Sequence, residues 1–104
     1  MDFKTILETL PTIDHLSGLN VIKGDKIIHH IPAIQGKLGS LRVYNALAQE
    51  FNGKFDRTRA ERGLQLFAEH TQDARENPAK HPNIDLLLQV IEQGLEYQLV
   101  PIHR

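Results

Sequence analysis

The stretch Ile31–Gly53, IPAIQGKLGSLRVYNALAQEFNG, decides how the rest of the chain is interpreted. It passes from an extended segment through a glycine-rich basic loop into the most regular helical pattern of the sequence. Ser40 is a typical helix N-cap, because its hydroxyl can accept a hydrogen bond from a free N–H of the first turn. One predicted helix face is apolar and consists of Leu41, Tyr44, Leu47, Ala48 and Phe51. We therefore expect a helix that begins at Ser40, packs on a core and ends at Asn52-Gly53.

Two runs rich in β-branched residues precede this stretch, LNVIK and KIIHHI, on either side of Gly24-Asp25. A two-residue turn of this kind predicts a β-hairpin. The predicted cross-strand pairs are Ile22 with Ile27, Val21 with Ile28 and Lys23 with Lys26. Because the last pair places two lysines opposite each other, a longer loop or a one-residue shift stays open. Both faces of the hairpin carry apolar residues, so we expect a sheet covered on both sides that ends its second strand at Pro32.

The other segments are mostly helical. Asp2 is placed to cap a short helix that Pro11 cannot continue, and Asp56 to cap a long helix that runs to Glu76. A fourth helix, Ile84–Gln93, is expected to be capped by His81 or Asn83 and ended by Gly94. The segment 95–102, LEYQLVPI, reads as a final strand, and Pro101 argues for a sheet edge or a strand end.

These elements predict an α+β fold. The hairpin and the C-terminal strand would form a small, mainly antiparallel sheet packed with about four helices. At 104 residues the chain is long enough for one modest core, so we expect a single domain over residues 1–104.

Composition excludes several classes of function. The formal charge of −1 gives no general attraction to nucleic acid, so no nucleic-acid partner is expected. The absence of cysteine removes disulfides, thiol nucleophiles and thiolate zinc sites. The N-terminus lacks the features of a signal peptide, and no apolar run approaches the roughly 20 residues that span a bilayer. We therefore expect a cytoplasmic protein with no membrane contact.

The loop before the second predicted helix is the first candidate site. Its candidate ligand-binding residues are Gly36, Lys37, Gly39, Ser40 and Arg42. A helix N-terminus presents unpaired N–H groups and a partial positive charge, and the glycines let a ligand approach the backbone. The pattern matches neither a Walker A loop nor G-x-G-x-x-G. It predicts an anion site, although glycines that shape a tight turn and a serine that only caps the helix would give the same pattern.

The long third helix carries the second candidate. Arg59, Arg62, Leu66, His70 and Asp73 would form one stripe beside its buried face. A His70–Asp73 pair could hold one imidazole tautomer, or His70, Asp73 and His81 could ligate a metal together with His29 or His30. No H-E-x-x-H spacing supports the metal hypothesis. The alternative is a solvated helix flank with ordinary pairing, and no cofactor is assigned.

Two segments carry a resemblance to a known family, HHIPAIQGKLGSLRVYNALA and LFAEHTQDARENPAKHPNIDLL. The chain resembles a family of small uncharacterised bacterial proteins over nearly its whole length. The resemblance implies a bacterial cytosolic protein of about this size. It implies no activity, so no catalytic residue comes from it.

Two classes of function stay open from the sequence. The first is a small-ligand domain, binding or regulatory, in which the basic loop holds an anion or phosphate and the helix stripe faces it across a pocket. The second is a protein-interaction module without a catalytic site, homodimeric through the hairpin edge or the final strand. A weak His/Asp metal site is a further alternative, and no reaction is assigned.

Overall fold

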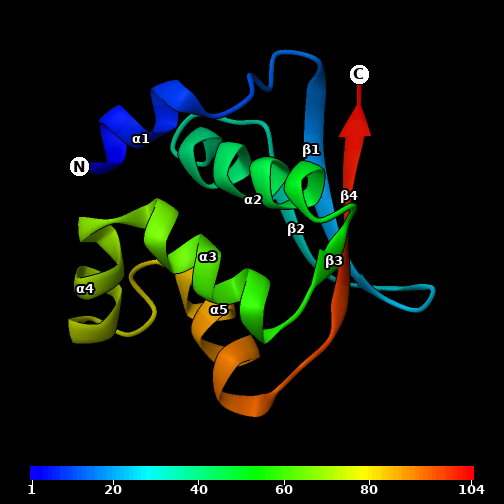
Figure 1. Cartoon of the computed structure of the whole chain (residues 1–104). Coiled ribbons are helices and arrows are strands. Elements are labelled where there is room, and N and C mark those ends of the chain that lie inside the picture. The colour runs from blue at the N-terminus through cyan, green and yellow to red at the C-terminus, as the bar shows by residue number, and fades with distance from the viewer.

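Five helices and a four-stranded antiparallel sheet confirm the predicted α+β fold (Figure 1). The computed structural model describes all residues, 1–104. In chain order the elements are α1 (Phe3–Thr9), β1 (Leu16–Lys23), β2 (Lys26–Pro32), α2 (Leu38–Glu50), β3 (Lys54–Phe55), α3 (Arg57–Phe67), α4 (Glu69–Glu76), α5 (Pro82–Gln93) and β4 (Tyr97–His103). None of the helices has the length and hydrophobicity needed to cross a membrane.

The strands are ordered β2-β1-β4-β3 across the sheet, and all neighbours are antiparallel. The two-residue strand β3 was not predicted, since so short a strand has no alternation to detect. It pairs with Tyr97 and Gln98 only, so β4 is an edge where it reaches Pro101. The Leu99 N–H donates to the Gly53 carbonyl, away from β1, and the nitrogen of Pro101 two residues further on faces the same open edge. The missing N–H of Pro101 therefore removes no hydrogen bond from the pairing of β4 with β1.

The hairpin has the predicted turn but a different register further on. Ile22 faces Ile27 and Lys23 faces Lys26, as the sequence predicts. The pairing of Val21 with Ile28 was wrong, because a bulge after Val21 places it opposite His29. A bulge leaves one extra residue on one strand, which a strict two-residue period cannot reveal.

The helices cover only one face of the sheet (Figure 1). The expectation of a sheet covered on both faces was therefore wrong. On the outer face Ile27 is 57% exposed and Val100 is 38% exposed. Antiparallel sheets commonly leave one face in solvent, so apolar residues on both strand faces were not decisive here.

The core lies between the inner sheet face and helices α2, α3 and α5. Tyr44 and Phe55 are its largest fully buried side chains. Gly63 of α3 lies where the side chains of Leu47 and Leu87 approach most closely, and a Cβ there would be 2.9 Å from Leu87 Cδ1. The missing side chain lets α3 pack against both α2 and α5.

Helix α2 begins before the predicted cap. It starts at Leu38 with Lys37 in the cap position, and no side chain caps it. The Ser40 N-cap was wrong, since Ser40 lies inside the first turn. The Lys37 N–H donates to the Ile34 carbonyl (3.0 Å), which forms a turn directly before α2. The backbone therefore already has a helix-like curvature where the helix begins. Such an entry needs no extended cap residue.

The predicted long helix is broken in two. Asp56 caps its start as expected, accepting from the Arg59 N–H at 3.2 Å. The chain turns sharply at Ala68, whose φ of 51° lies in the left-handed region, so the single helix to Glu76 was wrong. The Thr71 hydroxyl donates to the Leu64 carbonyl (2.7 Å) across the break and satisfies an acceptor that the helix end leaves free. The break separates the arginines of α3 from His70 on α4.

The remaining helix ends follow the predictions closely. Asp2 accepts from the Thr5 N–H (2.9 Å) at the start of α1. Helix α5 begins at Pro82, with His81 at the cap position but without a side-chain cap hydrogen bond. Gly94 ends it with a left-handed φ of 64°.

Candidate functional site

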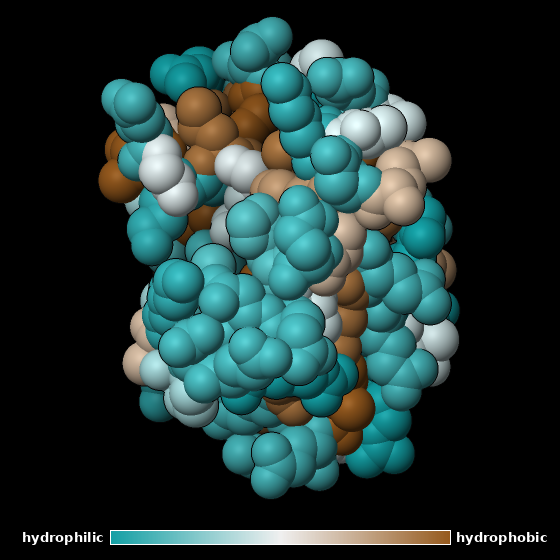
Figure 2. All heavy atoms as spheres, turned by 90° about the vertical axis from the view of Figure 1, so that its left-hand side faces the viewer, coloured by the Kyte–Doolittle hydropathy of each residue, from teal (hydrophilic) through white to brown (hydrophobic).

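A cleft of about 340 Å³ lies where the starts of α2 and α5 approach α1 and the α3–α4 junction. The loop into α2 contributes residues 36–40, and the loop into α5 contributes residues 80–84. Phe3, Phe67 and His70 complete its wall. Figure 2 shows this side of the molecule, where hydrophobic atoms reach the surface at the height of α1 and α2 above a largely hydrophilic lower half.

The titratable side chains of the cleft wall are all basic residues. They are Lys37, His70, Lys80 and His81, and no aspartate or glutamate lines the cleft. This one-sided lining contrasts with the nearly neutral chain as a whole. A concave wall of one sign concentrates field lines and attracts ligands of the opposite sign.

Two helix N-termini border the same cleft. Neither α2 nor α5 has a side-chain hydrogen bond at its cap. The first N–H groups of a helix have no partner within the helix, and they carry the positive end of its dipole. In α5 the Ile84 N–H donates to the His81 carbonyl (3.0 Å) and Pro82 has no N–H, so Asn83 supplies the free N–H of this turn. Both first turns line the cleft and add partial positive charge to that of Lys37, although Asp85 in the first turn of α5 offsets part of it.

Asn83 supplies a further donor from the first turn of α5. Its side-chain oxygen accepts from His29 Nε2 (2.7 Å), and its carbonyl accepts from the Tyr44 hydroxyl (2.6 Å). Burial raises the pKa of Tyr44, so this hydroxyl remains a proton donor. Asn83 is only 6% exposed and lines the cleft, while its amide nitrogen makes no hydrogen bond within the chain. The fully buried side-chain atoms without a hydrogen bond are Asn45 Nδ2 and Arg59 Nε, so the Asn83 amide nitrogen is open to solvent and available to a ligand that accepts hydrogen bonds.

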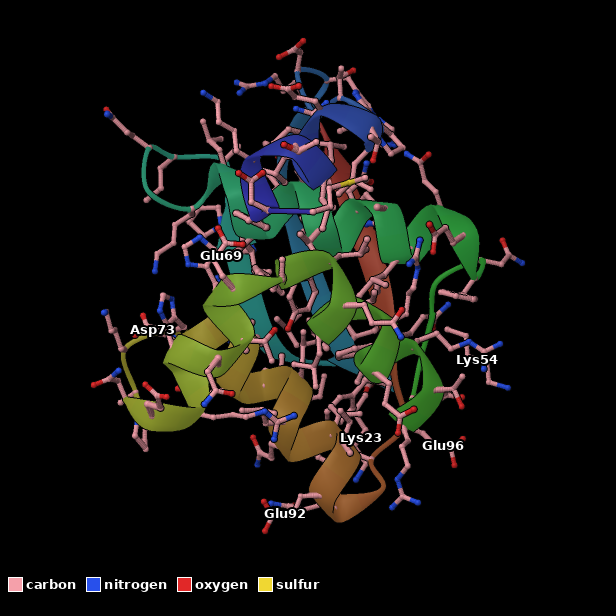
Figure 3. All side chains as sticks on the ribbon, turned by 60° about the vertical axis from the view of Figure 1, so that its left-hand side comes forward. Lys23, Lys54, Glu69, Asp73, Glu92 and Glu96 are labelled. Carbon is pink, nitrogen blue, oxygen red and sulfur yellow. The ribbon has the colours of Figure 1, made fainter.

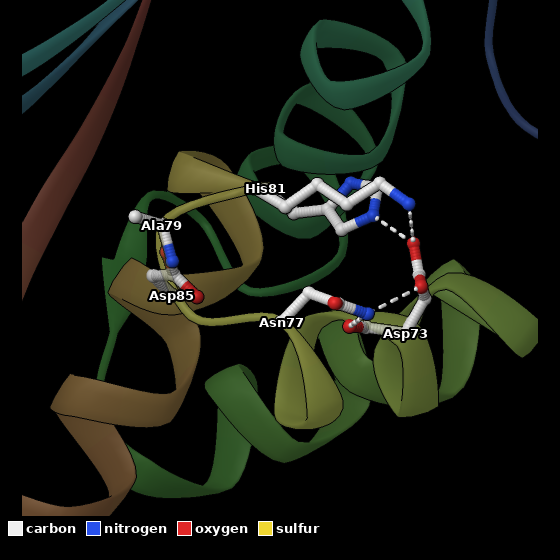
Figure 4. Close-up of polar contacts among 6 residues, drawn as sticks. Asp73, Asn77, Ala79, His81 and Asp85 are labelled. Atoms are coloured by element: carbon white, nitrogen blue, oxygen red, sulfur yellow. Dashed lines mark hydrogen bonds and ion pairs between the residues drawn. The ribbon is translucent and has the colours of Figure 1, made fainter.

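Asp73 fixes the two basic residues in the loop before α5. Its Oδ2 accepts from His81 Nε2 at 2.7 Å and from Lys80 Nζ at 2.9 Å, and Asn77 Nδ2 donates to Oδ1 at 2.9 Å (Figure 4). Figure 3 shows Glu69 on the side of α4 next to α1, whereas Asp73 lies next to the loop. With its carboxylate held by three donors, Asp73 orients His81 and Lys80 at the cleft wall.

Comparison with known proteins places the chain in a family. A family model described as an uncharacterised protein conserved in bacteria matches residues 3–101. The chain belongs to the DUF2322 family. This confirms the resemblance seen in the sequence, and every residue that lines the cleft lies within the match. No curated protein and no solved structure matches the chain.

The contacts of Asp73 with Lys80 and His81 predict how the stability of this DUF2322 chain changes at acid pH. The hydrogen bonds from His81 and Lys80 lower the pKa of Asp73 from 3.8 to about 2. A carboxylate with a lowered folded-state pKa stabilises the fold above its ordinary pKa, and this stabilisation is lost as the pH falls through the folded value. The unfolding temperature of the wild type should therefore exceed that of Asp73→Asn near neutral pH, and the difference should shrink as pH falls from 3.8 to about 2.

Thermal unfolding monitored by circular dichroism over this pH range measures the difference. Asp25→Asn, in the exposed hairpin turn, controls for the general effect of removing one carboxylate. A difference that stays constant down to the lowest pH would contradict the role given to Asp73.

The structure brings together only part of the predicted ligand site. Gly36, Lys37, Gly39, Ser40 and His70 line the cleft, and so does His81 from the metal hypothesis. Of the predicted helix stripe, only His70 lines the same cleft as the predicted loop.

The three predicted arginines lie outside the cleft. Arg42 donates to the carbonyls of Leu10 (2.8 Å) and Pro11 (3.2 Å), which ties α2 to the end of α1. Arg59 is 3.2 Å from Asp56 and lies over the Phe51 ring. Arg62 is 3.4 Å from Glu50. All three arginines are therefore occupied by partners outside the cleft.

The histidines are arranged differently from the metal hypothesis. Asp73 bonds to His81 rather than to His70, and no group of three His, Asp or Glu side chains is placed to hold a metal ion. His29 contacts Asn83 on the helix side of the sheet, while His30 bonds to Asn20 Oδ1 (2.6 Å) on the outer face. The hypothesis gains no support from this geometry.

Seven residues of the cleft are not among the predicted site residues. They are Phe3, Leu38, Phe67, Lys80, Pro82, Asn83 and Ile84. The sequence indicated only a capping role for Asn83. The stiff sequence 78–82, PAKHP, contained a signal for Lys80, since two prolines restrict the loop that presents it.

Proposed function

We propose that the cleft binds a small anion, phosphate or carboxylate, in a binding or regulatory domain. The observation that carries the proposal is the convergence of two helix N-termini without side-chain caps and of Lys37, which has no ion-pair partner, on one cleft. His70 lines the same wall, together with Lys80 and His81, which Asp73 holds. Helix N-termini bind phosphate and carboxylate groups through free N–H groups and the helix dipole. The unpaired amide nitrogen of Asn83 adds a neutral donor to the same wall.

Lys37 is the cation that best distinguishes a binding site from an ordinary helix start. It is half-buried at the N-terminus of α2 and has no ion-pair partner, whereas Lys80 is paired with Asp73. A lysine with no carboxylate beside it can give its full charge to a ligand. Removing it should therefore weaken binding without freeing a buried negative group.

Inorganic phosphate is the probe for this proposal. Phosphate should raise the unfolding temperature of the wild type, because a ligand that binds only the folded state stabilises it by mass action. Lys37→Ala should weaken phosphate binding about tenfold, as expected for loss of one charge-assisted hydrogen bond. Isothermal titration calorimetry measures the dissociation constant, and thermal shift confirms it.

Arg62→Ala is the matched control for this experiment. It removes one positive charge from α3 outside the cleft, so phosphate affinity should stay at the wild-type value. Absence of phosphate binding to the wild type, or equal losses in the two variants, would refute the proposed site.

The outer face of the sheet gives no specific support for a homodimer. A partly apolar outer sheet face, with Ile27 and Val100 exposed, is ordinary for an antiparallel sheet with one solvated side. It does not favour a second copy over solvent.

A further inference from the structure

Four ring side chains form a continuous row along the cleft wall. Phe67 and Phe3 are stacked, with centroids 5.5 Å apart and planes 17° from parallel. Phe3 meets His70 edge-on at 4.9 Å, and the His70 ring lies 5.7 Å from that of His81. The rings come from α3, α1, α4 and the loop before α5, and all four line the cleft. Phe67 is only 3% exposed and supports the row from behind, so Phe3, His70 and His81 present the ring surface beside the basic groups.

The cleft has room for more than an inorganic ion. Its volume of about 340 Å³ lies at the lower end of the range for small-molecule sites, roughly 300–1,000 Å³. Leu38, which is 46% exposed, adds apolar surface from the first turn of α2. A wall that combines apolar rings with a few convergent polar groups is typical of sites for organic ligands.

Gly39 holds the Phe3 ring against the start of α2. A Cβ on Gly39 would lie 3.2 Å from Phe3 Cε2, closer than an ordinary contact, so the absence of a side chain lets the ring approach. The Phe3 N–H also donates to Glu69 Oε1 (2.8 Å), which ties the first residue of α1 to α4. The ring therefore stands directly beside the helix N-terminus that would hold the anion.

We infer that the ligand is an organic anion whose phosphate or carboxylate group is attached to a flat aromatic ring. The inference rests on the proposed function and adds the class of ligand. The charged group lies at the two helix N-termini, and the ring packs against Phe3 and its neighbours in the row. Ring-to-ring contacts in offset or edge-on geometry contribute binding beyond the area they bury.

Phenyl phosphate and methyl phosphate test the inference, since they share the phosphate group and differ in the ring. Calorimetry on the full chain should show that phenyl phosphate binds about fivefold more tightly, within the effect expected of an aromatic pair. Phe3→Leu keeps an apolar side chain on Phe67 but removes the ring. It should bring the two affinities together and leave methyl phosphate binding unchanged. Benzoate and acetate, compared in the same way, show which anionic group the cleft prefers.

Phe51→Leu is the matched control. Phe51 lies under Arg59 outside the cleft, so this variant should keep the preference for phenyl phosphate. Equal binding of both phosphates to the wild type would overturn the ring inference and leave the anion site standing. No binding of either would overturn both. A preference that survives Phe3→Leu would show that the ring of Phe3 does not contact the ligand.

Discussion

Gly18→Ala is expected to lower the free energy of unfolding by about 2 to 3 kcal/mol, the upper range for overpacking. Gly18 lies in β1, paired with Pro32 of β2 and Ile102 of β4. A Cβ at this position would be 2.7 Å from the backbone oxygen of Ile31 and 2.9 Å from His30 Cε1. The oxygen cannot move away alone, because it belongs to the neighbouring strand. The substitution therefore shifts β2 relative to β1.

Urea denaturation followed by circular dichroism measures this loss. Gly24→Ala is the matched control, since Gly24 lies in the hairpin turn with φ of 63° and a Cβ added there would meet no atom within 4 Å. It should cost only the conformational term, about 1 kcal/mol for an L-residue in the left-handed region. A Gly18→Ala variant as stable as Gly24→Ala would show that the strands tolerate the added methyl group.

The sequence predicted the hairpin well because its signals are local. The Gly24-Asp25 turn sets the pairing of the residues next to it, and the pairs nearest the turn are found as expected. The bulge lies between Val21 and Ile22. No residue near the bulge differs from ordinary strand composition, so the register beyond it could not be predicted.

The break at Ala68, in contrast, has no local signal in the sequence. Helices usually break at glycine or proline, and the segment around Ala68 contains neither. The apolar period continues through the break, so one long helix was the natural prediction. The left-handed turn is spanned by the hydrogen bond from the Thr71 hydroxyl to the Leu64 carbonyl. An error in one helix thus moved Arg59 and Arg62 away from the site to which they had been assigned.

One wall of the cleft could be predicted, because local composition marks it in the sequence. Glycine and lysine before a helix indicated residues 36–40, whichever residue begins the helix. The second wall depends on the fold back at Ala68, which brings the start of α5 opposite the start of α2. The sequence also does not show whether a basic side chain is free to bind a ligand or already has a partner within the chain. Arg42 is such a case, because it donates to two backbone carbonyls.

Asn83→Asp is expected to weaken phosphate binding by on the order of a hundredfold, if the anion occupies the cleft as proposed. The change keeps the size of the side chain and replaces a neutral donor with a negative charge. Two unit charges about 4 Å apart interact by about 4 kcal/mol at an effective dielectric constant of about 20. Solvent reduces this repulsion, and the remaining effect is still larger than that of Lys37→Ala.

The fold should survive this substitution for two reasons. His29 Nε2 keeps an acceptor at the same position, and a carboxylate is favourable in the first turn of α5. Unfolding temperatures check this directly, and calorimetry with inorganic phosphate gives the change in affinity. Asn52→Asp adds the same charge at the exposed end of α2, far along the helix from the cleft, and should leave phosphate binding near the wild-type value. Equal losses in both variants would mean that net charge governs binding, whereas an unchanged affinity in Asn83→Asp would place the anion away from the start of α5.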